Sequence, residues 1–213
     1  MCAEISIWHR SSGEIDYFWI IRNTCALKIL KNISKIIVGY TFRGALPEDP
    51  RGDINVLLGK HITNEGVIDL EDLPKIQRND IRSEAFVKSG DVLLTTRGVF
   101  RAAASHDFPH TLASSSIYII RLIDKNILPE FLSIYLNSQT AQVAISQLLT
   151  GSSIKTILRK DLETLPIPVP TKTRQQQIIN IFSNWKCREQ LLHKKIKLDK
   201  NIAEGAIHYL LTL

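Results

Sequence analysis

The chain has 213 residues, enough for one domain of ordinary size with an appendage and too few for two full α/β domains. Hydrophobic residues make up 44 % of it, so it can bury a core, which argues against a wholly disordered chain. Its formal net charge of +6 is compatible with a polyanionic partner but does not require one.

The cysteines and the apolar segments indicate the compartment. Cys2, Cys25 and Cys187 are scattered and form no Cys-x-x-Cys pair, which favours free thiols in a reducing cytosol over a disulfide framework or a zinc ribbon. No stretch approaches the ~18 apolar residues of a membrane helix, and charged residues interrupt the start of the chain where a signal peptide would be apolar. We therefore expect a cytoplasmic protein with no membrane partner.

Residues 1–25 form a polar and aromatic lead-in that we leave unassigned. Its aromatic residues are typical of a strand pair packed on a domain, with a stacking platform as the alternative; they are Trp8, Tyr17, Phe18 and Trp19.

Residues 26–170 have the pattern of a strand-rich, mixed α/β domain. Apolar or β-branched runs next to glycine turns predict strands at 33–38, 53–58, 92–96 and 116–122. Pro129 is typical of the first turn of a helix, and an apolar face then continues towards Gly151, carried by Phe131, Ile134, Tyr135, Val143, Ile145 and Leu148. A short helix is predicted over 160–165, and the prolines of 166–170 predict an extended linker.

Residues 171–213 form a separate unit, predicted as one long helix from near Thr173. From Ile178 onward, positions spaced alternately four and three residues apart are mostly apolar, as in a coiled-coil seam with polar interruptions. Such a helix spans roughly 60 Å at ~1.5 Å per residue, which favours pairing with another helix over packing along its own domain. The expected contacts in this seam are Phe182, Trp185, Leu192, Ile196 and Leu210.

Motifs for several kinds of catalysis are missing from the sequence. It has neither the glycine-rich cofactor loop nor the Asn/Asp-Pro-Pro-aromatic motif of an adenine methyltransferase, and it lacks a phosphate-binding Gly-x-x-x-x-Gly-Lys-Ser/Thr loop. The acidic residues near Lys88 lack the spacing of a metal-dependent nuclease. His106 and His110 have the spacing of a helical zinc pair, but Pro109 disfavours a helix there. A binding module is therefore favoured over an enzyme.

Six stretches in this order carry a family resemblance: KNISKIIVGYTFRG (31–44), GDINVLLGKHITNEGVI (52–68), FVKSGDVLLTTRG (86–98), ASSSIYIIRL (113–122), LPEFLSIYLNS (128–138) and TGSSIKTILRKDLETLPIPVPTKTRQQQIINIF (150–182). The last is the most specific, with a Gly-Ser turn, a short helix, an Ile-Pro-Val-Pro connection and a glutamine-rich helix start. Together they resemble the target recognition domain and conserved helix of the specificity (S) subunits of type I restriction–modification enzymes.

The resemblance implies an α/β domain that reads double-stranded DNA and a helix that docks modification (methyltransferase) and restriction subunits. S-adenosylmethionine, ATP and Mg are then expected on those partners, with no cofactor or metal on this chain. Members of the family usually hold two recognition domains and two helices, and this sequence holds one of each. A half-subunit that forms a homodimer through antiparallel helices is therefore expected, and the lead-in of residues 1–25 remains unmatched.

Basic and small polar residues near predicted turns or helix starts are the candidates for DNA contact, since phosphates fix the register and base edges supply the specificity. Gly151-Ser152-Ser153 also offers backbone N–H groups to a phosphate. The candidates are Arg43, Lys60, Arg97, Arg101, Ser152, Lys155, Arg159 and Lys160. Two other classes of function stay open: a truncated interaction subunit that does not read DNA, and a DNA methyltransferase whose cofactor site is not recognisable.

Overall fold

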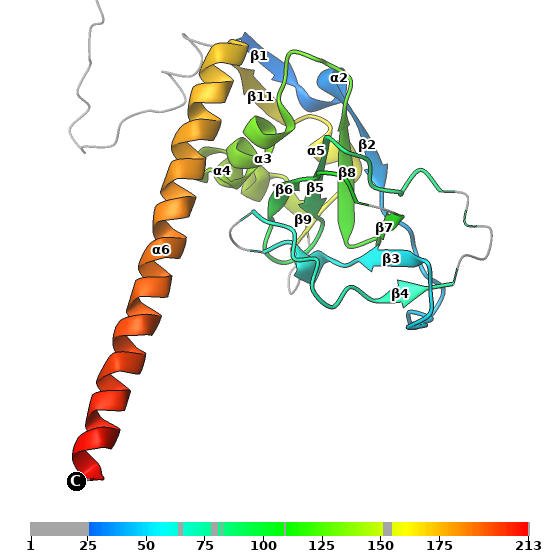
Figure 1. Ribbon diagram of the computed structural model, residues 1–213. Coiled ribbons are helices and arrows are strands. Elements are labelled where there is room, and N and C mark those ends of the chain that lie inside the picture. Colours follow the sequence, from blue (N-terminus) through cyan, green and yellow to red (C-terminus); the bar gives the residue numbers. More distant parts are fainter. Residues whose placement is uncertain are drawn as a thin grey trace, which may run out of the picture.

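The computed structural model describes residues 26–63, 66–77, 81, 83–108, 110–150 and 155–212 (Figure 1). The predicted strand pair within residues 1–25 and the turn at 151–153 lie outside the described residues.

A four-stranded antiparallel sheet forms the centre of the domain. Its order is β2-β8-β5-β6, with β2 at Ser34–Val38, β8 at Ile117–Leu122, β5 at Asp91–Thr95 and β6 at Ala102–Ala104. Three of the predicted strands are confirmed here. Gly90, with φ +82°, makes the turn into β5 in a backbone conformation that disfavours other residues.

Both faces of this sheet are buried, which is why its strands read as continuous apolar runs. Val92 and Leu94 of β5 lie in one core cluster with α2 (Leu30–Ile33) and the helices after β8. Leu93 points into a second cluster on the other face. That face is covered by a three-stranded sheet of order β4-β3-β7, formed by Lys75–Ile76, Ile54–Leu57 and Thr111–Ala113, with the 3-10 turn η1 (Gly59–His61) after β3.

The helix predicted from Pro129 towards Gly151 is wrong in its extent, because the structure has two helices there. α3 (Pro129–Asn137) ends at Ser138, which is extended, and the Ser138 hydroxyl then accepts the Ala141 N–H at the start of α4 (Gln139–Gln147). Leu132 and Ile145 are fully buried, whereas Val143, expected on the apolar face, is 49 % exposed. The Asn137 side chain, at the end of α3, forms two hydrogen bonds with the backbone of β6: it donates to the Ala102 carbonyl and accepts the Ala102 N–H.

The proline-rich segment is extended as predicted, but it is not a linker. It forms β11 (Pro166–Val169), which pairs antiparallel with β1 (Ala26–Ile29), so that Ala26 lies opposite Val169. Proline is tolerated in a two-stranded ribbon because one edge of each strand needs no ladder hydrogen bond. Before β11, β9 (Leu149–Thr150) pairs with β10 (Thr156–Ile157), and α5 spans Arg159–Leu162, shorter than the predicted helix.

The long C-terminal helix is confirmed as α6 (Lys172–Leu211), capped by the Thr171 hydroxyl. It begins beside β1 and β11, contacts α3, and then leaves the domain (Figure 1). From Gln190 to Thr212 every residue is exposed. None of the helices in the described ranges has an apolar run sufficient to cross a membrane.

Candidate nucleic-acid interface

The central sheet has two ends, and a pocket between cationic side chains opens at each. β5 runs from Asp91, which lies opposite Arg121 of β8, to Thr95, which lies opposite Ile117. We call these the Asp91 end and the Thr95 end. Because β5 has five residues and a strand rises ~3.4 Å per residue, the two ends are roughly 14 Å apart.

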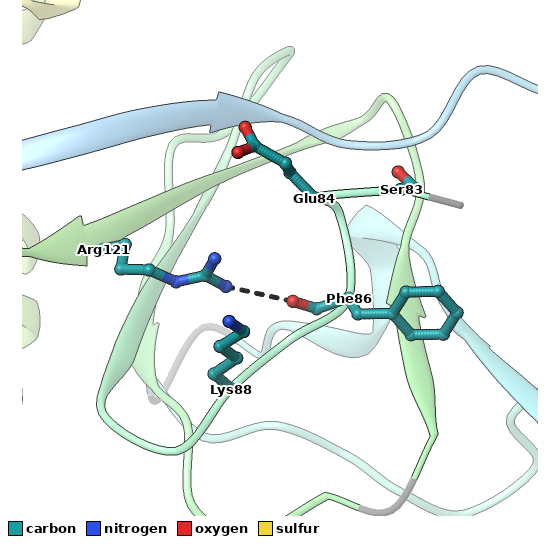
Figure 2. Close-up of a pocket in the computed structure, with 5 residues that line it drawn as sticks. All are labelled: Ser83, Glu84, Phe86, Lys88 and Arg121. Atoms are coloured by element: carbon teal, nitrogen blue, oxygen red, sulfur yellow. Dashed lines mark hydrogen bonds between the residues drawn. The ribbon is translucent and has the colours of Figure 1, made fainter. Parts of the chain in front are cut away.

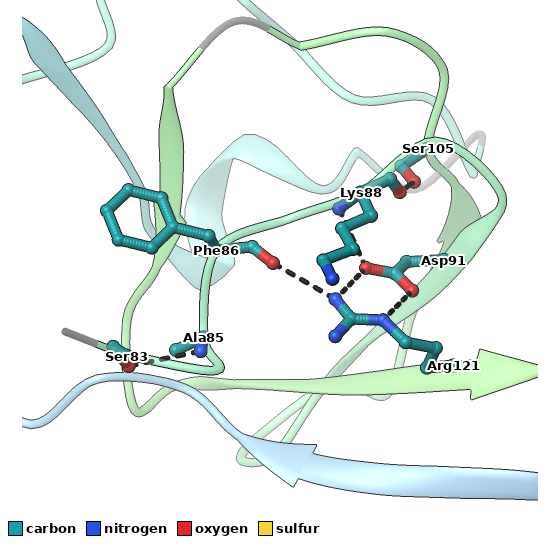
Figure 3. A network of polar contacts seen from close by, with 7 residues as sticks. All are labelled: Ser83, Ala85, Phe86, Lys88, Asp91, Ser105 and Arg121. Atoms are coloured by element: carbon teal, nitrogen blue, oxygen red, sulfur yellow. Dashed lines mark hydrogen bonds and ion pairs between the residues drawn. The ribbon is translucent and has the colours of Figure 1, made fainter.

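The pocket at the Asp91 end has a volume of about 440 Å³ and is lined by Ser83, Glu84, Phe86, Lys88 and Arg121 (Figure 2). Its arginine is already paired. Arg121 donates from Nε to Asp91 Oδ1 at 2.8 Å, and from Nη2 to Asp91 Oδ2 at 2.7 Å and to the Phe86 carbonyl at 3.0 Å (Figure 3). The hydrogen bond with Asp91 raises the pKa of Arg121.

Two carboxylates therefore offset two of the three cations at the Asp91 end. The Asp91 side chain is 2 % exposed and also accepts the Lys88 backbone N–H. Glu84 lies 2.6 Å from Lys35 Nζ, and this hydrogen bond lowers the pKa of the Glu84 carboxyl. The arrangement holds the loop before β5 against β8, which is a structural role, and leaves little net positive charge for a polyanion.

The pocket at the Thr95 end differs in its charge. It has a volume of about 420 Å³ and is lined by Leu58, Gly59, Lys60, Thr95, Arg97, Val99, Arg101 and Ser116. Three of the predicted DNA-contacting residues meet here, and no carboxylate is among the described residues that line it. Three cations around one open pocket without a counter-charge are typical of a site for an anion such as phosphate.

The turn between β5 and β6 positions the two arginines of this pocket. The Thr95 hydroxyl closes the turn by donating to the Val99 carbonyl at 2.7 Å and accepting the Arg101 N–H at 2.9 Å. Gly98, with φ +73°, donates its N–H to the Lys155 carbonyl at 3.0 Å. Lys155, a fourth predicted contact, is therefore held beside the turn that carries Arg97.

Arg101 holds a buried donor that has no partner among the described residues. Its Nη1 donates to the Ile62 carbonyl at 3.2 Å, while its buried Nε has no hydrogen-bond partner within the described part of the chain. A buried N–H without an acceptor costs free energy, so an anionic oxygen that reaches this guanidinium would bind with an added advantage.

Hydroxyl groups complete the floor of the pocket. Ser116 Oγ accepts the Gly59 N–H at 2.9 Å and lies 2.7 Å from Ser114 Oγ. The first of these bonds fixes η1, and with it Lys60, against the start of β8. Gly39 is packed so tightly here that a Cβ would overlap the Ser114 carbonyl, which keeps β2 close to the same end of the sheet.

The remaining predicted contacts lie at varying distances from the pocket. Arg43 is exposed on the loop that leaves β2 at the Thr95 end, just after Tyr40, which bridges to Ser114. Burial raises the pKa of the Tyr118 hydroxyl, and a backbone hydrogen bond of Arg159 and the charges of Arg159 and Arg97 oppose the shift. Lys160 is exposed on α5 with no contact that ties it to the pocket, and Ser152 lies outside the described residues.

The histidines considered as a zinc pair are not helical: residues 105–108 are irregular, and His110 has φ 45° in a turn. No group of three metal-ligating side chains occurs in the part of the chain that the structure describes.

The predicted seam of α6 is exposed on the protomer. Trp185, Leu192, Ile196 and Leu210 are each more than half exposed, and Phe182 is half-buried, with its ring centroid 5.5 Å from that of Trp185. Lys186 Nζ lies 4.8 Å from the Trp185 ring centroid and pairs with Glu189. The domain contacts of α6 lie near its start, through Gln175, which is seven residues before Phe182 in the heptad, and through Ile179. The seam is therefore free to meet another helix.

Three important residues were missed at the sequence level: Asp91, Arg121 and Gln175. Asp91 belongs to a Gly-Asp turn, and the partner of its carboxylate, Arg121, lies thirty residues further along the chain. Gln175 stands in a run of three glutamines, and no pattern separates it from its two exposed neighbours.

Comparison with known proteins decides the family. The model of the type I restriction modification DNA specificity domain matches residues 26–199. The chain belongs to this family. No curated protein matches it.

Solved structures of the specificity family share the fold. The S subunit of the type I restriction-modification system from M. genitalium is 21 % identical, with a TM-score of 0.53 over 84 % of this chain and 43 % of that one. The HsdS subunit from Thermoanaerobacter tengcongensis is 17 % identical, with a TM-score of 0.55 over 79 % and 39 %. A chain from a structure on complex assembly and conformational transition of the type I R-M system is 16 % identical, with a TM-score of 0.60 over 78 % and 39 %. The chain thus spans about two-fifths of the length of these structures.

Proposed function

We propose that this chain reads a DNA sequence for a type I restriction–modification system and directs partner methyltransferase and restriction subunits to it, without performing chemistry itself. The observation that carries the proposal is the pocket at the Thr95 end, where Lys60, Arg97 and Arg101 meet without a carboxylate on a domain of the specificity family. S-adenosylmethionine, ATP and Mg would be bound by the partners, and the flipped adenine would enter a methyltransferase pocket.

In this proposal the pocket holds the phosphate backbone and the loops beside it read the bases. Lysine and arginine at phosphates fix the register of a protein on the duplex, while base edges discriminate sequence. The loop that carries Arg43 and the segment 114–116 leave the sheet at the same end, so they are placed to reach a groove next to the clamped phosphate.

The phosphate role predicts a change in salt dependence. Each of Lys60→Ala and Arg97→Ala should weaken binding to a random-sequence 30-bp duplex and make the negative slope of log K against log salt shallower by about 0.9. Fluorescence anisotropy over a salt series, with the cognate modification subunit present, measures both quantities. Lys35→Ala, at the Asp91 end, is the matched control and should leave the slope unchanged. Equal slopes for all variants and wild type would remove the pocket from the interface.

We also propose that the chain forms a homodimer through antiparallel pairing of the α6 seam. The support is the exposed seam itself, together with a second exposed stripe about 100° around the helix, made of Leu191, Leu198, Ile202 and Tyr209. Because the two stripes are separate, α6 can pair with a second copy along one and contact a modification subunit along the other.

A homodimer predicts a symmetric target. Two identical domains related by a two-fold axis should read two inverted copies of one half-site around a spacer of fixed length. Adenine methylation would be mapped by sequencing in cells that carry this chain and its cognate modification subunit. A bipartite motif with unrelated halves would contradict the homodimer, and a continuous motif would contradict the role of paired helices. Binding to the modification subunit without any DNA recognition would favour the truncated interaction subunit.

A further inference from the structure

The side chain of Gln175 joins three segments of the protein at the base of α6. Its Oε1 accepts the Leu128 N–H at 2.8 Å, and its Nε2 donates to the Asn126 carbonyl at 2.9 Å and to the Pro170 carbonyl at 2.8 Å. The first two partners precede α3, and the third follows β11. Gln175 is 0 % exposed, although the whole helix beyond its first turns faces solvent.

Few other groups fix the direction of α6. Ile179, one turn later, packs on the core cluster that includes residues of α3, and α3 is the element with the most contacts to α6. Every residue from Gln190 onward is exposed, so the outer half of the helix is not braced by the domain. The angle between helix and domain is therefore decided at its first turns.

A long helix amplifies a small change at its base. A tilt of roughly 10° at residue 175 moves the far end of a ~60 Å helix by about 10 Å. That displacement corresponds to about three base pairs of B-DNA, which rises ~3.4 Å per base pair. A dimer that must hold two domains over half-sites at one separation therefore needs a rigid base for α6.

We propose that Gln175 is the positioning residue that fixes the angle of the recognition domain to α6 and so restricts the protein to one spacer length. This inference rests on the proposed function, because it needs paired helices and two half-sites. Gln175 acts through the placement of the domain and not through contact with DNA.

The test replaces the amide and keeps the shape of the side chain. Gln175→Met removes all three hydrogen bonds, and Gln175→Glu keeps the acceptor for Leu128 but places a carboxylate against two carbonyl oxygens. Gln177→Met is the matched control, since Gln177 is exposed two residues along the same helix. Thermal unfolding of each variant reports whether the domain remains folded.

Two readouts separate a positioning role from a general structural one. Spin labels at Glu71→Cys and Lys197→Cys, in a chain without its native cysteines and diluted with unlabelled protein, give the distance distribution between domain and helix. Both Gln175 variants should broaden it, and Gln177→Met should not. Methylation mapping with the cognate modification subunit should then show the same half-sites, now separated by spacers one base pair shorter and longer as well.

The results separate failure of this inference from failure of the proposed function. The inference would be overturned if the distance distribution of the Gln175 variants were unchanged, or if it broadened while methylation still showed a single spacer length. Loss of the folded domain in both Gln175 variants would also overturn it. A broadened distribution together with no bipartite motif for the wild type would instead refute the proposed function, while leaving the anchoring role of Gln175 in place.

Discussion

Ile196→Glu is expected to convert the proposed homodimer into monomers. Ile196 is 64 % exposed on the protomer, so the substitution should not disturb the fold, but pairing along the seam would bury the new carboxylate. Burying an unpaired charge costs several kcal/mol, and a symmetric dimer contains two copies of the change. Sedimentation at tens of micromolar protein should therefore show a dimer for the wild type and a monomer for the variant.

A matched control separates the seam from a general effect of charge. Gln190→Glu also adds one negative charge to an exposed position of α6, on a face away from both apolar stripes, and it should stay dimeric. A monomeric wild type, or a dimeric Ile196→Glu variant, would show that the seam is misassigned.

Asp91→Asn is expected to destabilise the domain by about 3–5 kcal/mol, the usual effect of removing one partner from a buried ion pair. The Asp91 side chain is 2 % exposed and accepts two hydrogen bonds from Arg121, which would lose its counter-charge at a site where it is 24 % exposed. Denaturant unfolding measures the loss as a lower free energy of unfolding, while the dependence of that free energy on denaturant concentration stays the same.

Glu84→Gln is the control for that measurement. Glu84 lines the same pocket, and its ion pair with Lys35 is as short as 2.6 Å, but its side chain is 66 % exposed. Exposed pairs contribute little because water screens both charges, so this variant should unfold nearly as the wild type does. Similar losses for the two variants would mean that burial does not determine the role of Asp91.

The sequence predicted the elements whose signals are local. β5 follows a Gly-Asp turn and is a continuous apolar run, and α3 starts at a proline, so both could be placed without knowledge of their neighbours. The long helix was also predictable, because seven-residue spacing extends over most of its length.

The features that the sequence did not reveal depend on contacts between distant segments. Ser138 interrupts α3 and α4 with one extended residue, and the apolar period continues across it, so a single helix was predicted. The sequence pattern of β11 predicts a linker rather than a strand, because its partner, β1, lies some 140 residues earlier. In the candidate site, the residue types could be predicted from the sequence, but their arrangement around one pocket could not. Lys60 comes from one turn and Arg97 and Arg101 from another, and the packing of β3 against the central sheet brings the two turns together.

The pairing of β1 with β11 has a consequence for how such proteins change over time. Because Ala26 lies opposite Val169, the recognition domain begins and ends at one point, beside the start of α6. A segment whose two ends are neighbours can be exchanged for another without displacing the helix attached to it. Under the proposed function, recombination between residues 26 and 169 would give the same assembly a new DNA target, while α6 passes unchanged from one variant to the next.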